Sequence, residues 1–305
     1  MNEPRTSRRP SRRQALAAAG GLTLGAVGGI ALAQASRPPA PTLIEASKRF
    51  AGKVVLVTGG TSGIGRAAVA AFAGQGAAVA FCGRREALGQ EVEAQVRDAG
   101  GTARYIRADV REEDQVAAFV RTAVETFHGL DIALNNAGIT IEKPLHEYSA
   151  AEWNDIVDTN LRGVFLAMKY QIPPMLERGG GTILVTSSSN EHRTSARRSV
   201  YTATKCGLIG LVRSAALDYA GQNIRINAIV PGTTDTALVR RVAGTENMPD
   251  ALWEIGAAQW ARSNLPGIKR MARPEEIAEF AVAMAAPELT YMTGAALVAD
   301  GGSGS

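Results

Sequence analysis

The chain contains few cysteines and histidines. Among its 305 residues there are two cysteines, Cys82 and Cys206, and three histidines. Two thiols are too few for a disulfide framework, and neither has the spacing of a metal ligand. We therefore expect no metal site, and we expect both cysteines to be small, buried apolar side chains.

The body of the chain also lacks a net charge. The formal charge of the whole chain is +4, but five arginines and only one acid lie in the first 35 residues. Residues 36–305 contain 28 basic and 28 acidic side chains. Binding to nucleic acid depends on a basic surface, so this balance predicts no DNA or RNA partner.

The first 35 residues have the three-part layout of an export signal. A basic stretch precedes an Ala/Gly/Leu-rich run over Ala15–Ala33, and small residues offer cleavage after Ala33 or Ala35. Ser11–Leu16, SRRQAL, resembles the twin-arginine export motif. We predict an exported, periplasmic or extracytoplasmic protein. The run is only mildly hydrophobic, so no stable span is expected in the mature chain, although a cytoplasmic leader and a membrane anchor remain alternatives.

The rest of the chain is organised as one domain. A Pro-rich linker covers residues 36–50, the domain covers 51–301 and a short tail covers 302–305. Short apolar runs alternate with helix-length segments, which predicts a doubly wound α/β architecture of the Rossmann type with a parallel sheet. The expected strands are Val54–Val57, Ala77–Phe81, Ala103–Ala108, Ile132–Leu134, Thr182–Val185, Ile224–Ile229 and Ala296–Val298.

A long stretch between Pro231 and Pro274 interrupts this alternation. It contains Trp253 and Trp260. In an α/β enzyme such an insertion lies over the carboxyl ends of the strands, where ligands bind. We expect this stretch to cover the substrate as a lid.

A glycine-rich segment, TGGTSGIG at Thr58–Gly65, follows the first expected strand and opens into a helical segment. In this context glycines bring the backbone close to a pyrophosphate at the helix N-terminus. Cofactor binding is therefore predicted for Gly59, Thr61, Ser62, Gly63, Ile64 and Gly65.

The end of the second strand lacks the acid that binds the ribose hydroxyls of NAD. Gly83 stands there, followed by Arg84 and Arg85. A guanidinium suits a 2′-phosphate, so we predict NADP with Arg84 as its contact. A solvated arginine is the alternative for Arg84, and Glu86 leaves NAD binding possible.

Tyr201 and Lys205 lie four residues apart in the helix-compatible run Val200–Leu217, so both should point from one helix face. A tyrosine with its ordinary pKa of about 10 is a poor base at neutral pH. A nearby ammonium favours the phenolate and would lower that pKa. Taken alone, the pair also fits an ordinary helix surface.

Other motifs accompany this pair. Ser188 lies thirteen positions before Tyr201, NNAG at Asn135–Gly138 follows an expected strand, Asn160 lies in a TNL sequence, and Pro231-Gly232 follows a later strand. With TGGTSGIG, this set resembles the short-chain dehydrogenase/reductase family over residues 51–301.

The resemblance implies roles for these residues. Tyr201 would be the general acid/base, Lys205 would tune its pKa and hold the nicotinamide ribose, Ser188 would orient the substrate oxygen, and Asn160 would place a relay water. The remaining implied cofactor-binding residues are Asp109 as the adenine contact, Val110, Asn136, Ala137, Gly138, Pro231, Gly232 and Thr234.

The resemblance also bears on assembly and on substrate. The segment Tyr291–Gly302 resembles the end of tetrameric members, which implies a homotetramer, with a dimer as the alternative. The segment Asn190–Ser199 departs from the family because it carries His192, Arg193, Arg197 and Arg198. These charges indicate either an anionic or polar substrate or a solvated loop.

Three functions follow from these patterns. The first is an NADP(H)-dependent oxidoreductase that transfers a hydride between nicotinamide and a small-molecule carbonyl or secondary alcohol. The second is an NAD-dependent alcohol, sugar or sterol dehydrogenase of the same family. The third, disfavoured by the intact residue set, is a non-catalytic nucleotide-binding protein on the same fold.

The export hypothesis predicts that replacing Arg12 and Arg13 by lysine keeps the full-length chain in the cytoplasm, because lysine does not reproduce the guanidinium pair. The wild type should reach the periplasm in a shortened form. Cell fractionation followed by immunodetection measures both. Full-length cytoplasmic protein from both genes would leave the segment as a leader only.

Overall fold

The computed structural model describes residues 48–304. The predicted export signal and nearly all of the linker lie outside the described residues, so both stay predictions, as does the oligomeric state. Among residues 48–304, no helix has both the length and the hydrophobicity that a membrane crossing requires.

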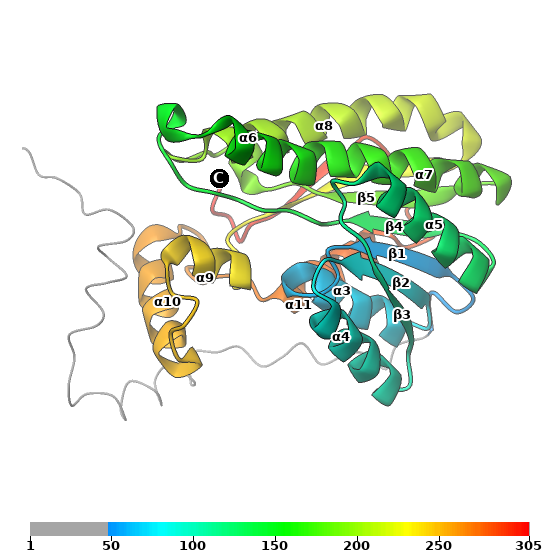
Figure 1. The fold of residues 1–305 in the computed structure, drawn as a ribbon, viewed down its shortest axis with the longest axis horizontal. Coiled ribbons are helices and arrows are strands. Elements are labelled where there is room, and N and C mark those ends of the chain that lie inside the picture. The colour runs from blue at the N-terminus through cyan, green and yellow to red at the C-terminus, as the bar shows by residue number, and fades with distance from the viewer. Residues whose placement is uncertain (1–47, 305) are drawn as a thin grey trace, which may run out of the picture.

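Seven parallel strands form one sheet in the order β3-β2-β1-β4-β5-β6-β7 (Figure 1). Every strand expected from the sequence is present, so the predicted doubly wound architecture is confirmed. The strands are β1 Val54–Thr58, β2 Ala78–Gly83, β3 Thr102–Arg107, β4 Ile132–Asn135, β5 Gly181–Thr186, β6 Ile224–Pro231 and β7 Ala296–Ala299.

Helices cover both faces of this sheet. Helices α5, α7 and α8 pack on one face, and α3, α4 and α11 pack on the other (Figure 1). The helices are α3 Gly63–Gly74, α4 Glu86–Asp98, α5 Glu113–Phe127, α6 Ala150–Val157, α7 Gly163–Glu177, α8 Ser199–Tyr219, α9 Ala237–Ala243, α10 Asp250–Asn264 and α11 Pro274–Met284, with a π-helical turn at Asp158–Arg162 between α6 and α7.

Strand β1 shows how the sequence builds the two cores. All five of its residues are buried, and successive side chains point to opposite faces of the sheet. Val54 and Leu56 pack under α5, α7 and α8, whereas Val55 and Val57 pack under α3 and α11. A strand with apolar residues at every position is therefore stable only when both faces are covered.

The strand order places the ligand site. The chain passes from β1 to β2 on one side of β1, and it later returns to form β4 on the other side. The loops that follow β1 and β4 therefore lead away from each other. A crevice opens at the carboxyl ends of the strands at such a switch point. The long stretch after β6 forms α9 and α10, which lie at this end of the sheet as predicted (Figure 1).

The two cysteines have different surroundings. Cys82 is buried in β2, as expected, but Cys206 is exposed, so the prediction of a buried side chain was wrong there. Cys206 follows the buried Lys205 on α8, and each helical residue turns about 100° from the last. This rotation carries the thiol to the surface, where it lies 3.4 Å from the Glu191 carbonyl oxygen.

Candidate active site

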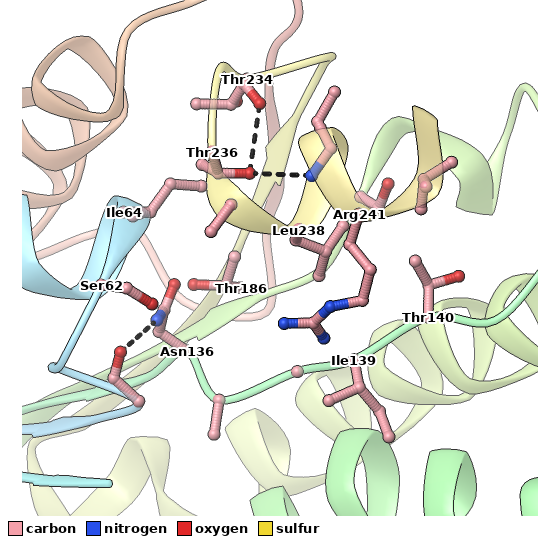
Figure 2. A pocket seen from close by; sticks show the side chains of 18 of the residues that line it. Ser62, Ile64, Asn136, Ile139, Thr140, Thr186, Thr234, Thr236, Leu238 and Arg241 are labelled. Carbon is pink, nitrogen blue, oxygen red and sulfur yellow. Dashed lines mark hydrogen bonds between the residues drawn. The ribbon is translucent and has the colours of Figure 1, made fainter. Parts of the chain in front are cut away.

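A cavity of about 390 Å³ lies at the carboxyl ends of the central strands, beneath α9 and α10 (Figure 2). Every site residue predicted from the sequence lines it, except Gly65 and Asn160. Trp253 and Trp260, which are buried on α10, contribute to its wall. The residues that are distant in sequence are therefore brought together in one site.

The glycine-rich loop leaves room for a pyrophosphate. Gly59 has a φ of 68°, which favours glycine, and a Cβ added at Gly65 would lie 2.2 Å from the Gly59 carbonyl oxygen. The loop therefore crosses the start of α3 too closely for a side chain. The buried Thr186 hydroxyl faces the same cavity without a hydrogen-bond partner from the described residues. These features fit a dinucleotide lying across the loop and the α3 N-terminus.

Asn136 connects the glycine-rich loop to the end of β4. Its backbone N–H donates to the Thr58 hydroxyl at 3.0 Å, and its side-chain amide donates to the Thr58 and Gly59 carbonyl oxygens at 3.3 and 3.5 Å. Figure 2 shows the Asn136 side chain in this position beside the glycine-rich loop. The two edges of the crevice are thereby held at a fixed separation.

The residues predicted to be catalytic converge from β5 and α8. Ser188 follows β5, while Tyr201 and Lys205 lie one turn apart on α8. The Lys205 ammonium donates to the Thr186 carbonyl oxygen at 2.7 Å and lies 5.6 Å from the centre of the Tyr201 ring.

Asn190 contributes to this group, although sequence patterns did not single it out. Its backbone N–H and its side-chain amide both donate to the Ser188 Oγ, at 3.2 and 3.1 Å. Both acceptor sites of that hydroxyl are occupied, so its single proton is left for Tyr201 or for the oxygen of a ligand in the cavity. Asn190 is thus a positioning residue for Ser188.

Burial dominates the electrostatics of Tyr201. It raises the pKa of the phenol, while a hydrogen bond from Ser188 and the charge of Arg198 act in the opposite direction. The expectation that Lys205 lowers this pKa is not met in the protein alone, because removal of the phenol from water outweighs the nearby charges. The effect of the Arg198 charge on the pKa of Tyr201 was not predicted from the sequence.

Asn160 lies in the π-helical turn and is fully buried behind the cavity. Its side chain accepts a hydrogen bond from the Ile139 N–H at 2.8 Å and donates to the Ile139 carbonyl oxygen at 2.9 Å. It also donates to the Thr204 hydroxyl at 3.2 Å. The side chain therefore fixes the loop after β4 and the catalytic helix, and both N–H groups of its amide are used.

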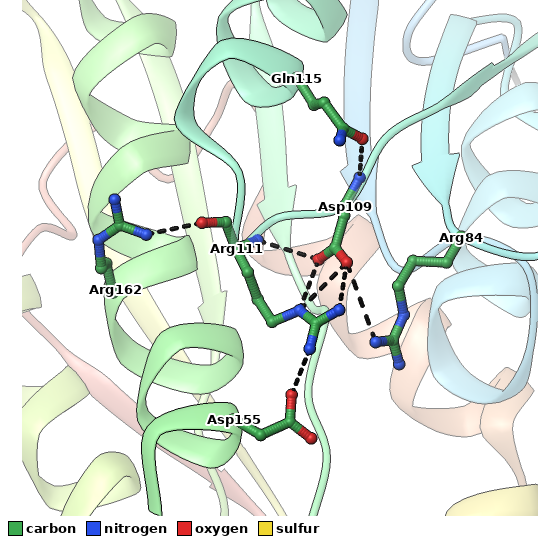
Figure 3. A network of polar contacts seen from close by, with 6 residues as sticks. All are labelled: Arg84, Asp109, Arg111, Gln115, Asp155 and Arg162. Carbon is green, nitrogen blue, oxygen red and sulfur yellow. Dashed lines mark hydrogen bonds and ion pairs between the residues drawn. The ribbon is translucent and has the colours of Figure 1, made fainter. Parts of the chain in front are cut away.

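At the other end of the cavity, Asp109 is held by an arginine that the motif search missed (Figure 3). Arg111 donates to both carboxylate oxygens, at 2.5 to 3.1 Å, and continues to Asp155 of α6 at 2.6 Å. Arg84 lies 4.0 Å from the same carboxylate. Burial alone would raise the pKa of Asp109, but its contacts with Arg111 lower it overall, so the carboxylate stays ionised.

Arg85 and Arg241 bring further positive charge to the glycine-rich loop. Arg85 donates to the Thr61 and Ser62 hydroxyls at 3.1 and 2.6 Å. Arg241 extends from α9 into the cavity toward Ile139 (Figure 2). Burial lowers the pKa of Arg85, and the charges of Arg241 and Arg84 lower it further. The three guanidiniums are therefore close enough to repel one another. Such a concentration of positive charge suits a phosphorylated ligand.

The close packing at Gly83 excludes a side chain. A Cβ added there would lie 2.7 Å from the Thr61 methyl carbon, and Thr61 is itself buried. An acid at position 83, where NAD-specific folds carry the residue that binds the ribose hydroxyls, thus has no space beside Thr61 in the structure.

Known proteins match this chain over its whole domain. A family model described as enoyl-(acyl carrier protein) reductase matches residues 59–304. An uncharacterized oxidoreductase of Thermotoga maritima is 40% identical over 83% of this chain and 98% of its own length. A cis-4-hydroxycyclohexanecarboxylate dehydrogenase of Sinomonas cyclohexanicum is 39% identical over 83% of this chain and 97% of its own. The solved structure of levodione reductase, 32% identical, superimposes with a TM-score of 0.77 and covers 84% of this chain and 98% of that one.

The chain belongs to the short-chain dehydrogenase/reductase family. The identities exceed 30% along almost the full length of the relatives, and the family model's match, residues 59–304, includes strands β2 to β7 and the Tyr201–Lys205 pair. Members of the family use nicotinamide dinucleotides. This short-chain dehydrogenase/reductase is therefore an oxidoreductase of CH–OH groups.

The buried Lys205 predicts a stability that depends on pH. Burial lowers its pKa from 10.5 to about 8. Below pH 8 the folded protein therefore keeps a buried ammonium that has lost its hydration, and this penalty lowers the free energy of unfolding. Between pH 8 and 10.5 the unfolded chain binds more protons, so the penalty disappears as the pH rises. Lys205→Met should stabilise the cofactor-free protein at pH 7 by about 2 to 3 kcal/mol, after the lost hydrogen bond is counted.

Urea unfolding at pH 7 and pH 10 measures this effect, and the gain should shrink at the higher pH. Lys169→Met, at an exposed lysine of α7, should show no such pH-dependent gain. A Lys205→Met variant that is less stable than the wild type at pH 7 would show that the ammonium is not under a burial penalty.

Proposed function

We propose that this protein is an NADP(H)-dependent enzyme that interconverts a carbonyl and a secondary alcohol, with Tyr201 as the general acid/base. The single observation that supports this most directly is the convergence of Tyr201, Lys205 and Ser188 on one cavity whose opposite end carries Arg84 and Arg85. A cluster of guanidiniums suits a 2′-phosphate, and NAD remains the alternative cofactor.

The chain's own residues account for the proton transfer. A bound nicotinamide dinucleotide supplies the hydride for reduction or accepts it in oxidation. Tyr201 gives a proton to the carbonyl oxygen during reduction and takes it from the hydroxyl during oxidation. Ser188, with both of its acceptor sites filled by Asn190, donates its proton to the same oxygen. The Lys205 ammonium places positive charge beside the ring on which the phenolate forms.

We further propose a ring-bearing alcohol or ketone as the substrate class. Trp253 and Trp260 of α10, with Leu238 and Met271, give the lid side of the cavity an apolar wall. An apolar wall beside a few polar groups suits a compact hydrocarbon ring with one reacting oxygen. The relative from Sinomonas cyclohexanicum, named for a hydroxycyclohexanecarboxylate, supports this class.

Removing the phenolic oxygen tests the catalytic assignment. Tyr201→Phe should lower kcat by about 10²- to 10⁴-fold, because general acid/base catalysis is lost, while NADPH binding should be nearly unchanged. Absorbance of the reduced nicotinamide measures turnover on a panel of cyclic ketones, and fluorescence titration measures binding. Tyr219→Phe, at the end of the same helix, should keep the wild-type rate. Substantial turnover by Tyr201→Phe would refute the assignment.

Replacing Arg84 tests the choice of cofactor. Arg84→Ala should raise the Kd for NADPH about tenfold and leave the Kd for NADH nearly unchanged, because only NADPH carries the 2′-phosphate. Arg97→Ala, at the far end of α4, removes the same charge and should affect neither constant. An equal loss for both cofactors would contradict the 2′-phosphate contact.

A further inference from the structure

A second, smaller cavity of about 90 Å³ adjoins the substrate end of the active site. Two arginines, Arg193 and Arg198, line it together with hydroxyl and amide side chains, and Leu265 is its one large apolar residue. No acidic residue lines it within the part of the chain that the structure describes. We call this cavity the arginine niche.

The arginine niche is continuous with the active site. Ser189, Asn190, Arg198 and Thr233 line both cavities. Asn190 also donates a hydrogen bond to the Ser188 hydroxyl, so a residue of the niche is in direct contact with a reacting group. A substrate whose oxygen contacts Ser188 and Tyr201 could therefore extend a second group into the niche.

The arginine niche carries one uncompensated positive charge. Arg198 uses Nε and Nη2 to bind Glu142, and both side chains of this ion pair are about one-fifth exposed. Arg193 pairs with no acidic side chain among residues 48–304. The two arginines and Glu142 sum to a single positive charge at this end of the cavity. A monoanion would balance that charge, whereas a dianion would leave an excess of negative charge.

The donors of the niche match a carboxylate. Guanidiniums and hydroxyls all donate to oxygen, and a carboxylate accepts at both of its oxygens. The hydroxyls of Ser195 and Thr233 have no hydrogen-bond partner in the described part of the chain, so they are available to such a group. A volume of about 90 Å³ admits a carboxylate but not a second ring.

We propose that the arginine niche binds a carboxylate of the substrate, so that the enzyme prefers ring ketones and alcohols that carry an acid remote from the reacting oxygen. This inference rests on the proposed function and adds a specificity site to it. Arg193 is its specificity-determining residue, and Arg198 contributes both to the niche and to the field at Tyr201.

A matched pair of substrates tests the proposal. The NADPH-loaded enzyme is assayed with 4-oxocyclohexanecarboxylate and with its uncharged methyl ester, and kcat/KM is compared as a ratio. The ratio should favour the acid at least about tenfold in the wild type, as expected for one charge-assisted contact. Because both substrates meet the same preparation, partial misfolding of a variant cancels in the ratio.

Variants at Arg193 should lower this ratio further as the side chain at position 193 becomes less positive. Arg193→Ala should bring it close to one, Arg193→Lys should retain part of the preference, and Arg193→Glu should favour the ester. Arg213→Ala removes an equal charge from the exposed face of α8 and should leave the ratio at its wild-type value.

Two failures are distinguishable. If the wild type reduces the ester as efficiently as the acid, the niche proposal is overturned while the proposed function stands. If it reduces neither ketone, the proposed function fails for ring ketones. Calorimetric titration of the NADPH-loaded protein then tests separately whether the niche binds a carboxylate. Cyclohexanecarboxylate should then bind more tightly than cyclohexanecarboxamide, and Arg193→Ala should remove the difference. Equal binding of the two would overturn the niche.

Discussion

Three segments of the chain meet at the buried amide of Asn160. The amide accepts a hydrogen bond from the Ile139 N–H and donates one to the Ile139 carbonyl oxygen. It also donates a hydrogen bond to the Thr204 hydroxyl on α8. The loop after β4, the π-helical turn and the catalytic helix are therefore held by one side chain. This joint sets the distance between α8 and the loop after β4, while the hydrogen bonds of Lys205 with Thr186 and Ser187 hold the same helix against the end of β5. Unpaired burial of any of these groups would be costly, which makes the joint rigid.

The electrostatic design of the site contrasts with that of the whole domain. The domain, residues 51–301, carries 25 basic and 27 acidic side chains, yet the cavity is lined by Arg84, Arg85 and Arg241 at one end and by Lys205 and Arg198 at the other. The acids of this region are committed as partners, with Asp109 bound to Arg111 and Glu142 bound to Arg198. Positive charge is thus concentrated where an anionic ligand would lie, and the rest of the surface compensates.

Sequence patterns predicted the features that depend on local periodicity or on fixed spacing. The apolar strand runs, the glycine-rich loop and the Ser188–Tyr201–Lys205 spacing all belong to this kind, and their positions in the fold agree with the prediction. Arg111 and Arg241 were missed because their roles arise from contacts with distant segments or across the cavity, and Asn190 was missed because its contact with Ser188 depends on the turn after β5. The pKa of Tyr201 was also beyond sequence reasoning, because burial cannot be read from the neighbours of a residue in the chain. The charges of the Asn190–Ser199 segment were left open between a solvated loop and a substrate contact, and the fold places Arg193 and Arg198 beside the active site.

The tight contact between Gly83 and Thr61 couples the side chains that these two positions can hold. An acid at position 83 would create a binding group for the ribose hydroxyls, but its Cβ would meet the Thr61 methyl carbon at 2.7 Å. A change of Thr61 to serine removes that methyl group while keeping the hydroxyl that Arg85 binds. An acid at position 83 is therefore compatible with this loop only when the side chain at position 61 is smaller or turned away from it.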